Sequence, residues 1–409
     1  MRNDPDRKDP GEPFRHEQQW NRCEGIVRWD PFGPEMADPV RALDRVRVRA
    51  PLVWTDRGGG FWALTRYEDI ARVARDFRRF GQGRPQRGAP RPPLEVDPPL
   101  HTAYRAILRP YFTGQRLASF EDEVRSLVVA RLQPLLDQGG GDVAPTLTHP
   151  LPTEVLCRFL RLPSQSAQII DRLSDEIYRN EEGRGGNPEA VAAADAELTE
   201  HAFSVVSARR RAPEDPEVDL ISGLIAARID GAALDDAQIV EVLRLLFVAG
   251  HNSTTSSLGI CLLALARDRE AQETLRGRPA MLPRAIDEFL RLETPVLGMP
   301  RTVREETDLF GARLAPGDQL FLLWGSANRD DRVFEEAATC RLDRQPNKHM
   351  VFGRGIHSCL GRELAEMELR VVCEELLART SSIELAGEVT RTSWVRFGVS
   401  RLPLRLFAR

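Results

Sequence analysis

The sequence contains one glycine-rich stretch that predicts the fold, Phe352-Gly353-Arg354-Gly355-Ile356-His357-Ser358-Cys359-Leu360-Gly361. Its glycines suit a loop in which the backbone turns sharply and approaches a flat ligand closely. The loop delivers a single cysteine to the start of an apolar-periodic segment. We interpret Cys359 as a thiolate that binds a metal.

The residues that follow Cys359 predict a helix that buries one face. Apolar side chains recur at steps of four, three and four residues, at Leu360, Leu364, Met367 and Val371. Because backbone N–H groups and the helix dipole favour negative charge at a helix start, we expect the pKa of the Cys359 thiol to be lowered. The alternative for an isolated cysteine is a buried structural thiol.

The pattern Phe-Gly-x-Gly-x-His-x-Cys-x-Gly in this loop resembles the haem-binding signature of the cytochromes P450, and all six specified positions match. The resemblance implies that Cys359 is the proximal ligand of haem b. It also implies that Phe352 packs beside the sulfur and that His357 reaches a haem propionate. Gly353 and Gly361 then belong to the same cofactor-binding loop.

Composition narrows the class of protein. The chain has 409 residues, 42% of them hydrophobic, and a formal net charge of −4, which gives no reason to expect a nucleic-acid partner. No apolar run approaches the roughly 20 residues of a membrane span, and no signal peptide is evident, so we expect a cytoplasmic protein without membrane association. The six cysteines lack paired spacing, which argues against a disulfide framework or a zinc site.

Two further segments resemble P450 motifs that surround the haem. The first, Asp97-Pro98-Pro99-Leu100-His101-Thr102-Ala103-Tyr104-Arg105, implies that His101 and Arg105 pair with propionates. The second, Thr294-Pro295-Val296-Leu297-Gly298-Met299-Pro300-Arg301, implies a strand along the haem edge. By this resemblance Arg301 meets a propionate, and the substrate pocket is lined in part by Val296, Leu297, Met299 and, from a C-terminal hairpin, Val399.

A capping-box spacing at Asp235 and Gln238 predicts a helix that runs to about Arg267, a rod of roughly 50 Å at about 1.5 Å per residue. Its centre, Ala249-Gly250-His251-Asn252-Ser253-Thr254-Thr255, resembles the oxygen-activation segment of P450s. The resemblance implies that Ala249 and Gly250 leave room beside the haem. The alternative is a polar helix-packing patch. We also assign to the pocket the residues that precede this centre, Leu246 and Phe247.

This helix departs from the family at the pair that most P450s supply as an acid and an alcohol. The corresponding residues are Asn252 and Ser253. An amide holds a water but does not titrate, which puts the usual carboxylate proton route in doubt. Ser253, Thr254 or a water chain are the candidates to replace it.

Glu288 and Arg291 are three residues apart on a predicted short helix. In isolation they indicate an exposed ion pair worth about 0.3 kcal/mol. The P450 resemblance instead implies a buried structural pair that anchors the loop before the cysteine. The third partner of that pair is usually Arg or His, but Thr339 stands at the aligned position, so either Arg341 or Arg344 replaces it.

The loop at residues 81–99 carries Arg84, Arg87 and Arg91. A charge run is usually a solvated face, and the alternative is that one arginine meets an anionic group of the substrate. Farther on, helices at about 164–180 and 189–211 flank a glycine-rich segment, which matches the helix pair that P450s use as a lid.

Together these motifs occur in P450 order and imply a mainly α fold with a smaller β-rich part, a triangular prism with the haem between the long central helix and the helix after Cys359. We expect residues 1–25 to form a loosely held arm and residues 26–409 a single catalytic domain. The implied oxidoreductase is a monomeric monooxygenase of secondary metabolism or xenobiotic oxidation. It inserts one oxygen atom of O2 into a small organic substrate by hydroxylation, epoxidation or O/N-dealkylation.

No electron-transfer domain is visible in the sequence, so the resemblance implies a separate ferredoxin and ferredoxin reductase as partners. Basic residues near the cysteine motifs are candidates for the docking patch, namely Arg109, Lys348, Arg354 and Arg362. Two alternatives are a peroxide-dependent haem-thiolate oxygenase, which would explain the missing carboxylate, and a non-catalytic P450-like auxiliary protein. Such auxiliary proteins tend to lose the haem cysteine, which this chain retains.

Overall fold

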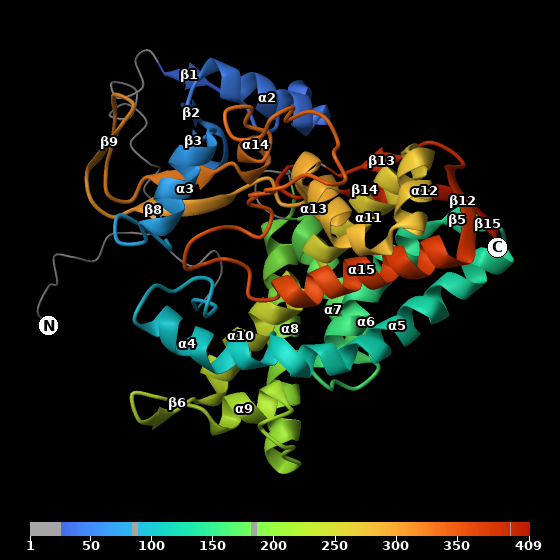
Figure 1. Ribbon diagram of the computed structural model, residues 1–409. Helices are drawn as coiled ribbons and strands as arrows, with labels where there is room; N and C mark the ends of the chain where they lie inside the picture. The colour runs from blue at the N-terminus through green and yellow to red at the C-terminus, as the bar shows by residue number, and fades with distance from the viewer. Residues whose placement is uncertain (1–25, 84–88, 181–185, 393) are drawn as a thin grey trace, which may run out of the picture.

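The computed structural model describes residues 26–83, 89–180, 186–392 and 394–409. Most of the described chain is helical, with a smaller β-rich part, as predicted (Figure 1). The α-helices are α2 (Pro39–Arg49), α3 (Tyr67–Arg75), α4 (Leu100–Leu108), α5 (Gly114–Asp137), α6 (Pro150–Phe159), α7 (Ser166–Arg179), α8 (Pro188–Arg211), α9 (Leu220–Ala226), α10 (Asp236–Ala249), α11 (Asn252–Arg267), α12 (Arg269–Gly277), α13 (Leu282–Leu292), α14 (Trp324–Ala327) and α15 (Arg362–Arg379).

The strands form one larger sheet and several small ones. The larger sheet has the order β1-β2-β3-β11-β8-β4, and a second sheet has the order β12-β15-β5. The strands are β1 (Val27–Arg28), β2 (Leu52–Thr55), β3 (Phe61–Leu64), β4 (Phe80–Gly81), β5 (Gly140–Asp142), β6 (Arg228–Ile229), β7 (Ala232–Ala233), β8 (Met299–Val303), β9 (Thr307–Leu309), β10 (Ala312–Leu314), β11 (Gln319–Leu322), β12 (Thr380–Leu385), β13 (Thr390–Arg391), β14 (Val399–Arg401) and β15 (Pro403–Ala408).

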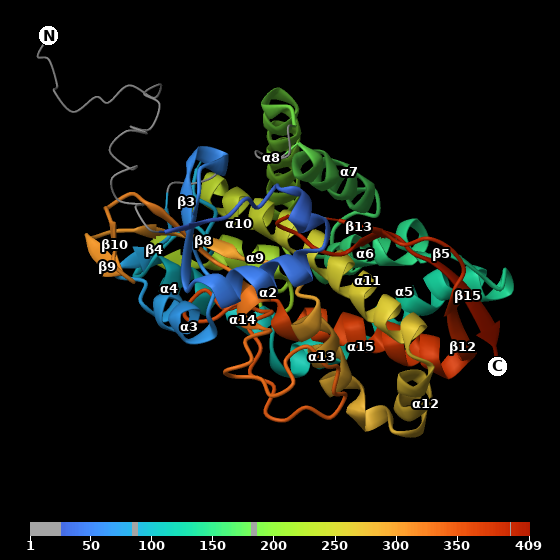
Figure 2. The same ribbon diagram turned by 90° about the horizontal axis from the view of Figure 1, so that it is seen from above.

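The sheets lie at opposite ends of the molecule. The six-stranded sheet, with α2 and α3, is at one end, and the β12-β15-β5 sheet and the C-terminus are at the other (Figures 1 and 2). Within the larger sheet β2 and β3 pair antiparallel, with Leu52 opposite Leu64 and Thr55 opposite Phe61. Strand β3 then pairs in parallel with β11, which pairs antiparallel with β8.

Helix α15, which follows the cysteine loop, packs between several helices of the α-rich part. It contacts α5, α11 and α13, and its buried face includes the apolar residues that the periodicity predicted from Leu364 onward. Fully buried leucines and valines of these helices form one continuous apolar core. A second core lies between the six-stranded sheet, α2, α3 and α14. The rigid support behind the cysteine loop is therefore made by both cores.

The predicted long helix is interrupted at its centre. Asp235 and Gln238 form the expected capping box, but α10 ends at Ala249 and α11 begins at Asn252. The prediction of one continuous rod was wrong. Ser253 Oγ donates a hydrogen bond to the Ala249 carbonyl (3.1 Å), and such bonding of a serine hydroxyl to the carbonyl four residues earlier bends helices.

The predicted lid pair is present as α7 and α8, which pack against each other. Helix α8 projects from the body of the molecule in both views (Figures 1 and 2). The proposed N-terminal arm, residues 1–25, lies outside the described residues. Within the described part of the chain, none of the helices has the length and apolar character that crossing a membrane requires.

Candidate haem-thiolate site

Backbone hydrogen bonds fix the cysteine loop. The Cys359 N–H donates to the Phe352 carbonyl (2.8 Å), and the Ser358 N–H donates to the Gly355 carbonyl (3.2 Å). Gly355 has a positive φ of 80°, and a Cβ added there would stand 2.0 Å from the carbonyl oxygen of Ala74. Only glycine fits this close approach to α3, so the sequence pattern reflects a real packing constraint.

Part of the Cys359 side chain is exposed, although protein atoms surround it on most sides. The protein therefore leaves part of this side chain open to a ligand. Burial raises the pKa of the Cys359 thiol, against the opposing effects of the Gly361 N–H, Arg105 and Arg362. Our prediction of a lowered thiol pKa was therefore wrong for the protein without a cation on the sulfur, because desolvation outweighs the helix start and the arginines.

The predicted propionate-binding residues converge near this cysteine. The rings of His101 on α4 and His357 lie edge to face with centroids 4.5 Å apart. Arg105, one turn after His101, donates from Nη1 to the Ser358 carbonyl (2.7 Å). Arg301 on β8 is only 4% exposed, and its Nη1 donates to the adjacent Pro300 carbonyl (2.8 Å). Four cationic or titratable side chains thus meet from three segments, namely α4, β8 and the cysteine loop.

This group of residues fits an anionic ligand. His101 is 5% exposed, and neither of its ring nitrogens has a hydrogen-bond partner in the described chain. Burial, then His357 and Arg105, lower the pKa of His101 to about 4, and burial lowers the pKa of Arg301 to about 10. Asp97 offsets part of the positive charge, but buried donors without a hydrogen-bond partner are costly unless an acceptor completes them. Haem propionates beside a cysteine sulfur have the charge and position that these residues require.

His357 also has a protein partner that the sequence analysis did not predict. Its Nε2 lies 3.2 Å from Oδ1 of Asp97, the aspartate that opens the Asp-Pro-Pro segment. The same carboxylate pairs with Arg304 and accepts a hydrogen bond from the Gln82 N–H (2.8 Å). Asp97 therefore orients the His357 ring and joins the loop at residues 81–99 to the cysteine loop. The signal for it was the motif itself, in which we had assigned roles only to His101 and Arg105.

Glu288 and Arg291 on α13 form a fully buried pair. Arg291 Nε and Nη2 bind the two carboxylate oxygens at 2.7 and 2.8 Å, and both side chains are 0% exposed. Arg344 Nε binds Glu288 Oε1 at 2.9 Å, whereas Arg341 contributes only its backbone N–H (3.0 Å). Burial raises the pKa of Glu288, but Arg291 and Arg344 outweigh it and hold that pKa below its usual value. Of the two arginines left open by the sequence, Arg344 provides the side chain.

The buried pair reaches the cysteine loop through Asn328. Arg291 Nη1 donates to the Asn328 carbonyl (2.9 Å), and the Asn328 side-chain oxygen accepts from the Met350 N–H (2.6 Å). Met350 in turn accepts from the Gly353 N–H (3.0 Å) at the start of the cysteine loop. A continuous set of buried hydrogen bonds thus runs from α13 to the loop that holds Cys359.

At the break between α10 and α11, small and polar residues surround an accessible position. Ala249 is exposed although it lies in the middle of the molecule. Gly250 faces elsewhere, because a Cβ on it would stand 3.1 Å from Leu156 of α6. Its small size therefore serves the packing of α6, and a role in leaving room beside the haem stays a prediction. Asn252 is 8% exposed, and its Nδ2 has no partner within the described residues.

The predicted pocket residues divide into accessible and packed positions. Val296 and Met299 keep part of their surface, and Leu246 is 8% exposed. Three others lie in packed interior. Phe247 is 0% exposed and faces His201 of α8, with ring centroids 6.0 Å apart. Leu297 lies in the sheet core beside Gly325, and Val399 packs on Gly259 of α11.

Of the three loop arginines, only Arg91 lies within the described residues, while Arg84 and Arg87 do not. Arg91 is 5% exposed and binds Glu95 through Nε (3.1 Å) and Nη2 (2.5 Å). A bidentate internal pair satisfies its charge. Arg91 therefore neither forms a solvated face nor offers itself to a substrate anion.

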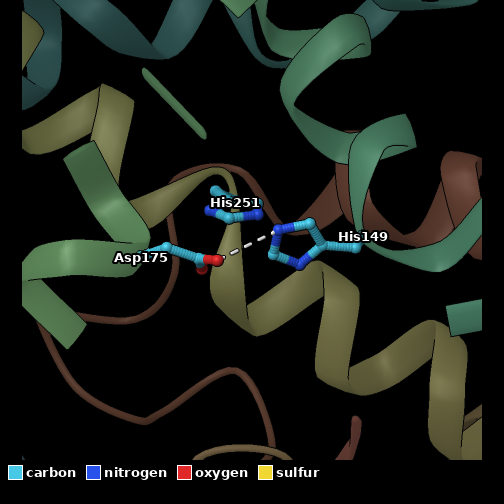
Figure 3. A group of neighbouring side chains, drawn as sticks. All are labelled: His149, Asp175 and His251. Atoms are coloured by element: carbon cyan, nitrogen blue, oxygen red, sulfur yellow. Dashed lines mark ion pairs between the residues drawn. The ribbon is translucent and has the colours of Figure 1, made fainter. Parts of the chain in front are cut away.

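Sequence analysis also missed the partners of His251 at the helix break. His251 is 0% exposed, with Nε2 2.9 Å from Asp171 of α7, and its ring lies 4.8 Å from that of His149 (centroid to centroid). His149 Nε2 lies 3.3 Å from Oδ2 of Asp175 (Figure 3). The only sequence signal was the four-residue spacing of Asp171 and Asp175 on one face of α7. None of the five cysteines that the structure describes forms a disulfide.

Comparisons with known proteins agree with this geometry. The family model of cytochrome P450 matches residues 186–277 and 280–400. Linalool 8-monooxygenase from Pseudomonas putida is 30% identical over 375 residues, which cover 86% of this chain and 91% of that protein. Mycinamicin IV hydroxylase/epoxidase from Micromonospora griseorubida is also 30% identical, over 88% of this chain and 91% of that protein.

A solved structure has the same fold. CYP109E1 from Bacillus megaterium superposes with a TM-score of 0.81 at 29% identity, covering 91% of this chain and all of that one. The mainly α architecture with a smaller β-rich part is thus the P450 fold, and the family's cofactor is haem b. The chain belongs to the cytochrome P450 family and is a monooxygenase of the bacterial type.

Proposed function

We propose that this P450 uses electrons from a separate ferredoxin and ferredoxin reductase to insert one oxygen atom of O2 into a small organic substrate, by hydroxylation, epoxidation or dealkylation. Residues 26–409 form its catalytic domain. The observation that carries the proposal is the meeting of an accessible Cys359 with the buried guanidinium of Arg301 and with His101, whose buried ring nitrogens lack hydrogen-bond partners among the described residues. A haem with a thiolate ligand favours O–O cleavage when it binds oxygen.

The residues around the haem position have distinct roles in this proposal. Cys359 holds the iron, while His101, Arg105, Arg301 and His357 bind the propionates and so fix the orientation of the ring. Phe352 shields the sulfur, with the Arg362 guanidinium 5.2 Å from its ring centroid. Because Arg301 and His101 are buried donors that would bind the propionates, loss of either should weaken haem retention.

On the side of the haem position where O2 would bind, the chain supplies hydroxyls and an amide in place of a carboxylate. Ser253 Oγ donates a hydrogen bond to the Ala249 carbonyl. The lone pairs of the serine oxygen therefore remain available to accept a hydrogen bond from a donor on the side where O2 would bind. Asn252 Nδ2, buried without a partner, orients a water. Thr254 is 5% exposed and is the alternative hydroxyl. The pocket is walled by Leu246, Ala249, Val296 and Met299.

Electron delivery needs a basic docking face near the cysteine loop. Arg109, Lys348 and Arg362 are exposed. Arg354 is half-buried and donates to the Tyr67 hydroxyl (3.2 Å). The three exposed cations are therefore the candidates for contact with an acidic ferredoxin.

The test has a spectroscopic part and a turnover part. The ferrous CO complex of the wild type should show the red-shifted Soret band of thiolate ligation. Cys359→Ala should lose this band, and Cys340→Ala, which removes another free cysteine, should keep it. A histidine-type spectrum in the wild type would overturn the haem-thiolate assignment.

Turnover distinguishes the source of the oxidant. A library of small organic compounds is screened by the spin-state shift of the ferric protein, and the best binder is then oxidised with ferredoxin, reductase and NADH or with peroxide alone. We expect product from the partner-driven reaction. Product from peroxide only would replace the partner-dependent function with a peroxide-dependent one. No product in either reaction with a compound that shifts the spin state would favour an auxiliary role.

A further inference from the structure

A cluster of two histidines and two aspartates joins three elements at the helix break. His149 comes from the residue before α6, Asp171 and Asp175 come from α7, and His251 lies between α10 and α11. One ligand atom from each of His149, Asp175 and His251 lies within 4.8 Å of the other two. Figure 3 shows these three side chains converging from separate elements.

The distances in the cluster resemble those between ligands of one metal ion. His149 Nε2 lies 3.4 Å from Asp171 Oδ2 and 3.3 Å from Asp175 Oδ2. With zinc–ligand bonds of about 2.0–2.1 Å, two ligands of a tetrahedral ion are separated by about 3.3 Å. His251 Nε2 lies 2.9 Å from Asp171 Oδ1. Asp171 thus contacts both histidines through its two oxygens, while one ligand atom of each of the other three side chains lies within 4.8 Å of the other two.

His251 provides a second, independent observation. Its side chain is 0% exposed, and although Nε2 is close to Asp171, neither ring nitrogen makes a hydrogen bond of acceptable geometry with any described residue. A buried imidazole without hydrogen bonds is costly. It is aimed into the cluster, and a bound cation would satisfy its Nε2.

We propose that His149, Asp171, Asp175 and His251 form a binding site for a divalent transition-metal cation of the Zn²⁺ type, distinct from the haem. Imidazole and carboxylate are ligands that zinc accepts. Two neutral imidazoles and two carboxylates around a dication give a site of zero net charge, which suits its half-buried position. The exposed fractions of the His149, Asp171 and Asp175 side chains are 31%, 27% and 20%, so the ion has an entry path.

The position of the site gives the ion a structural role. It ties α7, one helix of the lid pair, to the break beside Asn252 and to the start of α6. The Thr153 hydroxyl donates a hydrogen bond to Asp171 Oδ1 (3.0 Å), and Arg179 Nη2 donates one to Asp175 Oδ2 (3.2 Å). These two bonds fix the positions of the carboxylates. We therefore expect metal binding to stiffen the attachment of α7 to α6 and to the break.

The test is zinc binding by the haem-loaded protein after chelator treatment and desalting. Equilibrium dialysis against Zn²⁺ should give one saturable site per haem, and hydrogen exchange of the α7 amides should slow when zinc is present. His149→Ala and Asp175→Asn should each weaken binding by at least roughly tenfold and abolish the slowing. Haem content and the CO spectrum report whether each variant is folded.

Two control variants exclude other sites. His201→Ala removes a half-buried histidine of α8 outside the cluster, and Cys340→Ala removes an exposed thiol that could take up zinc on its own. Both should bind zinc as the wild type does. The proposal is overturned if the wild type shows no saturable site, or if both cluster variants bind zinc as tightly as the wild type. If His149→Ala fails to hold haem, Asp175→Asn alone decides the outcome.

Discussion

Behind the cysteine loop, the buried Glu288 and Arg291 satisfy each other and their neighbours, whereas at the helix break the described residues offer no partner to Asn252 Nδ2 or His251 Nδ1 and only the Asp171 carboxylate to His251 Nε2. Both regions place polar side chains in the interior. The first uses them to fix a loop through a closed set of hydrogen bonds. The second leaves donors and acceptors available for a ligand, such as a water molecule or a metal ion. The difference separates a scaffold from a site.

We expect the largest loss of stability when the buried hydrogen-bond network around Glu288 is broken. Glu288→Ala leaves Arg291 and Arg344 buried without a carboxylate, which costs on the order of 3–5 kcal/mol. We expect a lower melting temperature and poor haem incorporation. The matched control is Glu335→Ala, because the Glu335 side chain is 85% exposed and pairs with Arg341 at 3.4 Å. Equal melting temperatures and haem contents in the two variants would show that the buried pair does not anchor the loop.

A second experiment compares the two arginines that the sequence could not separate. The Arg344 side chain is 5% exposed and also donates from Nη1 to the Glu335 carbonyl (2.7 Å). Arg344→Ala should reduce the free energy of unfolding by about 2 kcal/mol, because a charge-assisted set of buried bonds is lost. Arg341→Ala should cost less than about 0.5 kcal/mol, since its side chain makes only exposed ion pairs. Urea unfolding of both variants measures the difference, and the reverse order would contradict the geometry.

The same contrast explains what the sequence could predict. Glu288 and Arg291 are three residues apart on one helix, so their pairing follows from local geometry. Whether Arg341 or Arg344 completes the pair depends on the path of the chain between Ala337 and Asn347, which no local pattern encodes. The carbonyl of Thr339, the residue at the usual partner position, is used instead, accepting from Arg344 Nη2 at 3.2 Å.

The helix break was missed for a related reason. Apolar periodicity continues through Ala249 and Gly250, and a period alone predicts one rod. The interruption arises from a tertiary contact, the approach of α6 through Leu156, together with the Ser253 hydroxyl on the Ala249 carbonyl. Likewise, His149 is far from His251 in the chain, and only the packing of α6 and α7 on the break brings them together. The cysteine loop was predicted because its motif is contiguous.

Changes in the hydroxyls and the amide at the helix break should alter how efficiently electrons are converted into product. Ser253→Ala removes the hydroxyl bound to the Ala249 carbonyl, so we expect product formed per electron pair to fall on the order of tenfold, with peroxide released instead. Asn252→Asp should keep or raise this ratio, because a carboxyl group titrates and an amide does not. Thr254→Ala is the matched hydroxyl variant. If coupling is unchanged in Ser253→Ala and lost in Thr254→Ala, Thr254 and not Ser253 supplies the hydroxyl for oxygen activation.

The smallest expected effect concerns the pH dependence of the cluster at the break, measured in chelator-treated protein. Asp171, then Asp175, raise the pKa of His149 from 6.5 to about 10. A folded-state pKa above the unfolded value gives a contribution that is complete below about pH 6.5 and is lost as the pH rises toward 10. Because the site is half-exposed to solvent, we expect this loss to be on the order of 1–2 kcal/mol.

His149→Gln removes the titrating group and keeps a donor, so the difference in unfolding free energy between wild type and variant isolates this contribution. The difference should shrink steadily between pH 6.5 and 9.5, because the stabilising proton on His149 is progressively lost over this range, whereas ionisation at distant groups affects both proteins alike. The Glu288 pair provides the contrast, since Arg291 and Arg344 hold the pKa of its carboxyl below the usual value and leave it ionised throughout this range. The difference between wild type and Glu288→Ala should therefore stay constant with pH. A constant difference for His149→Gln as well would mean that His149 does not hold its proton between the two aspartates.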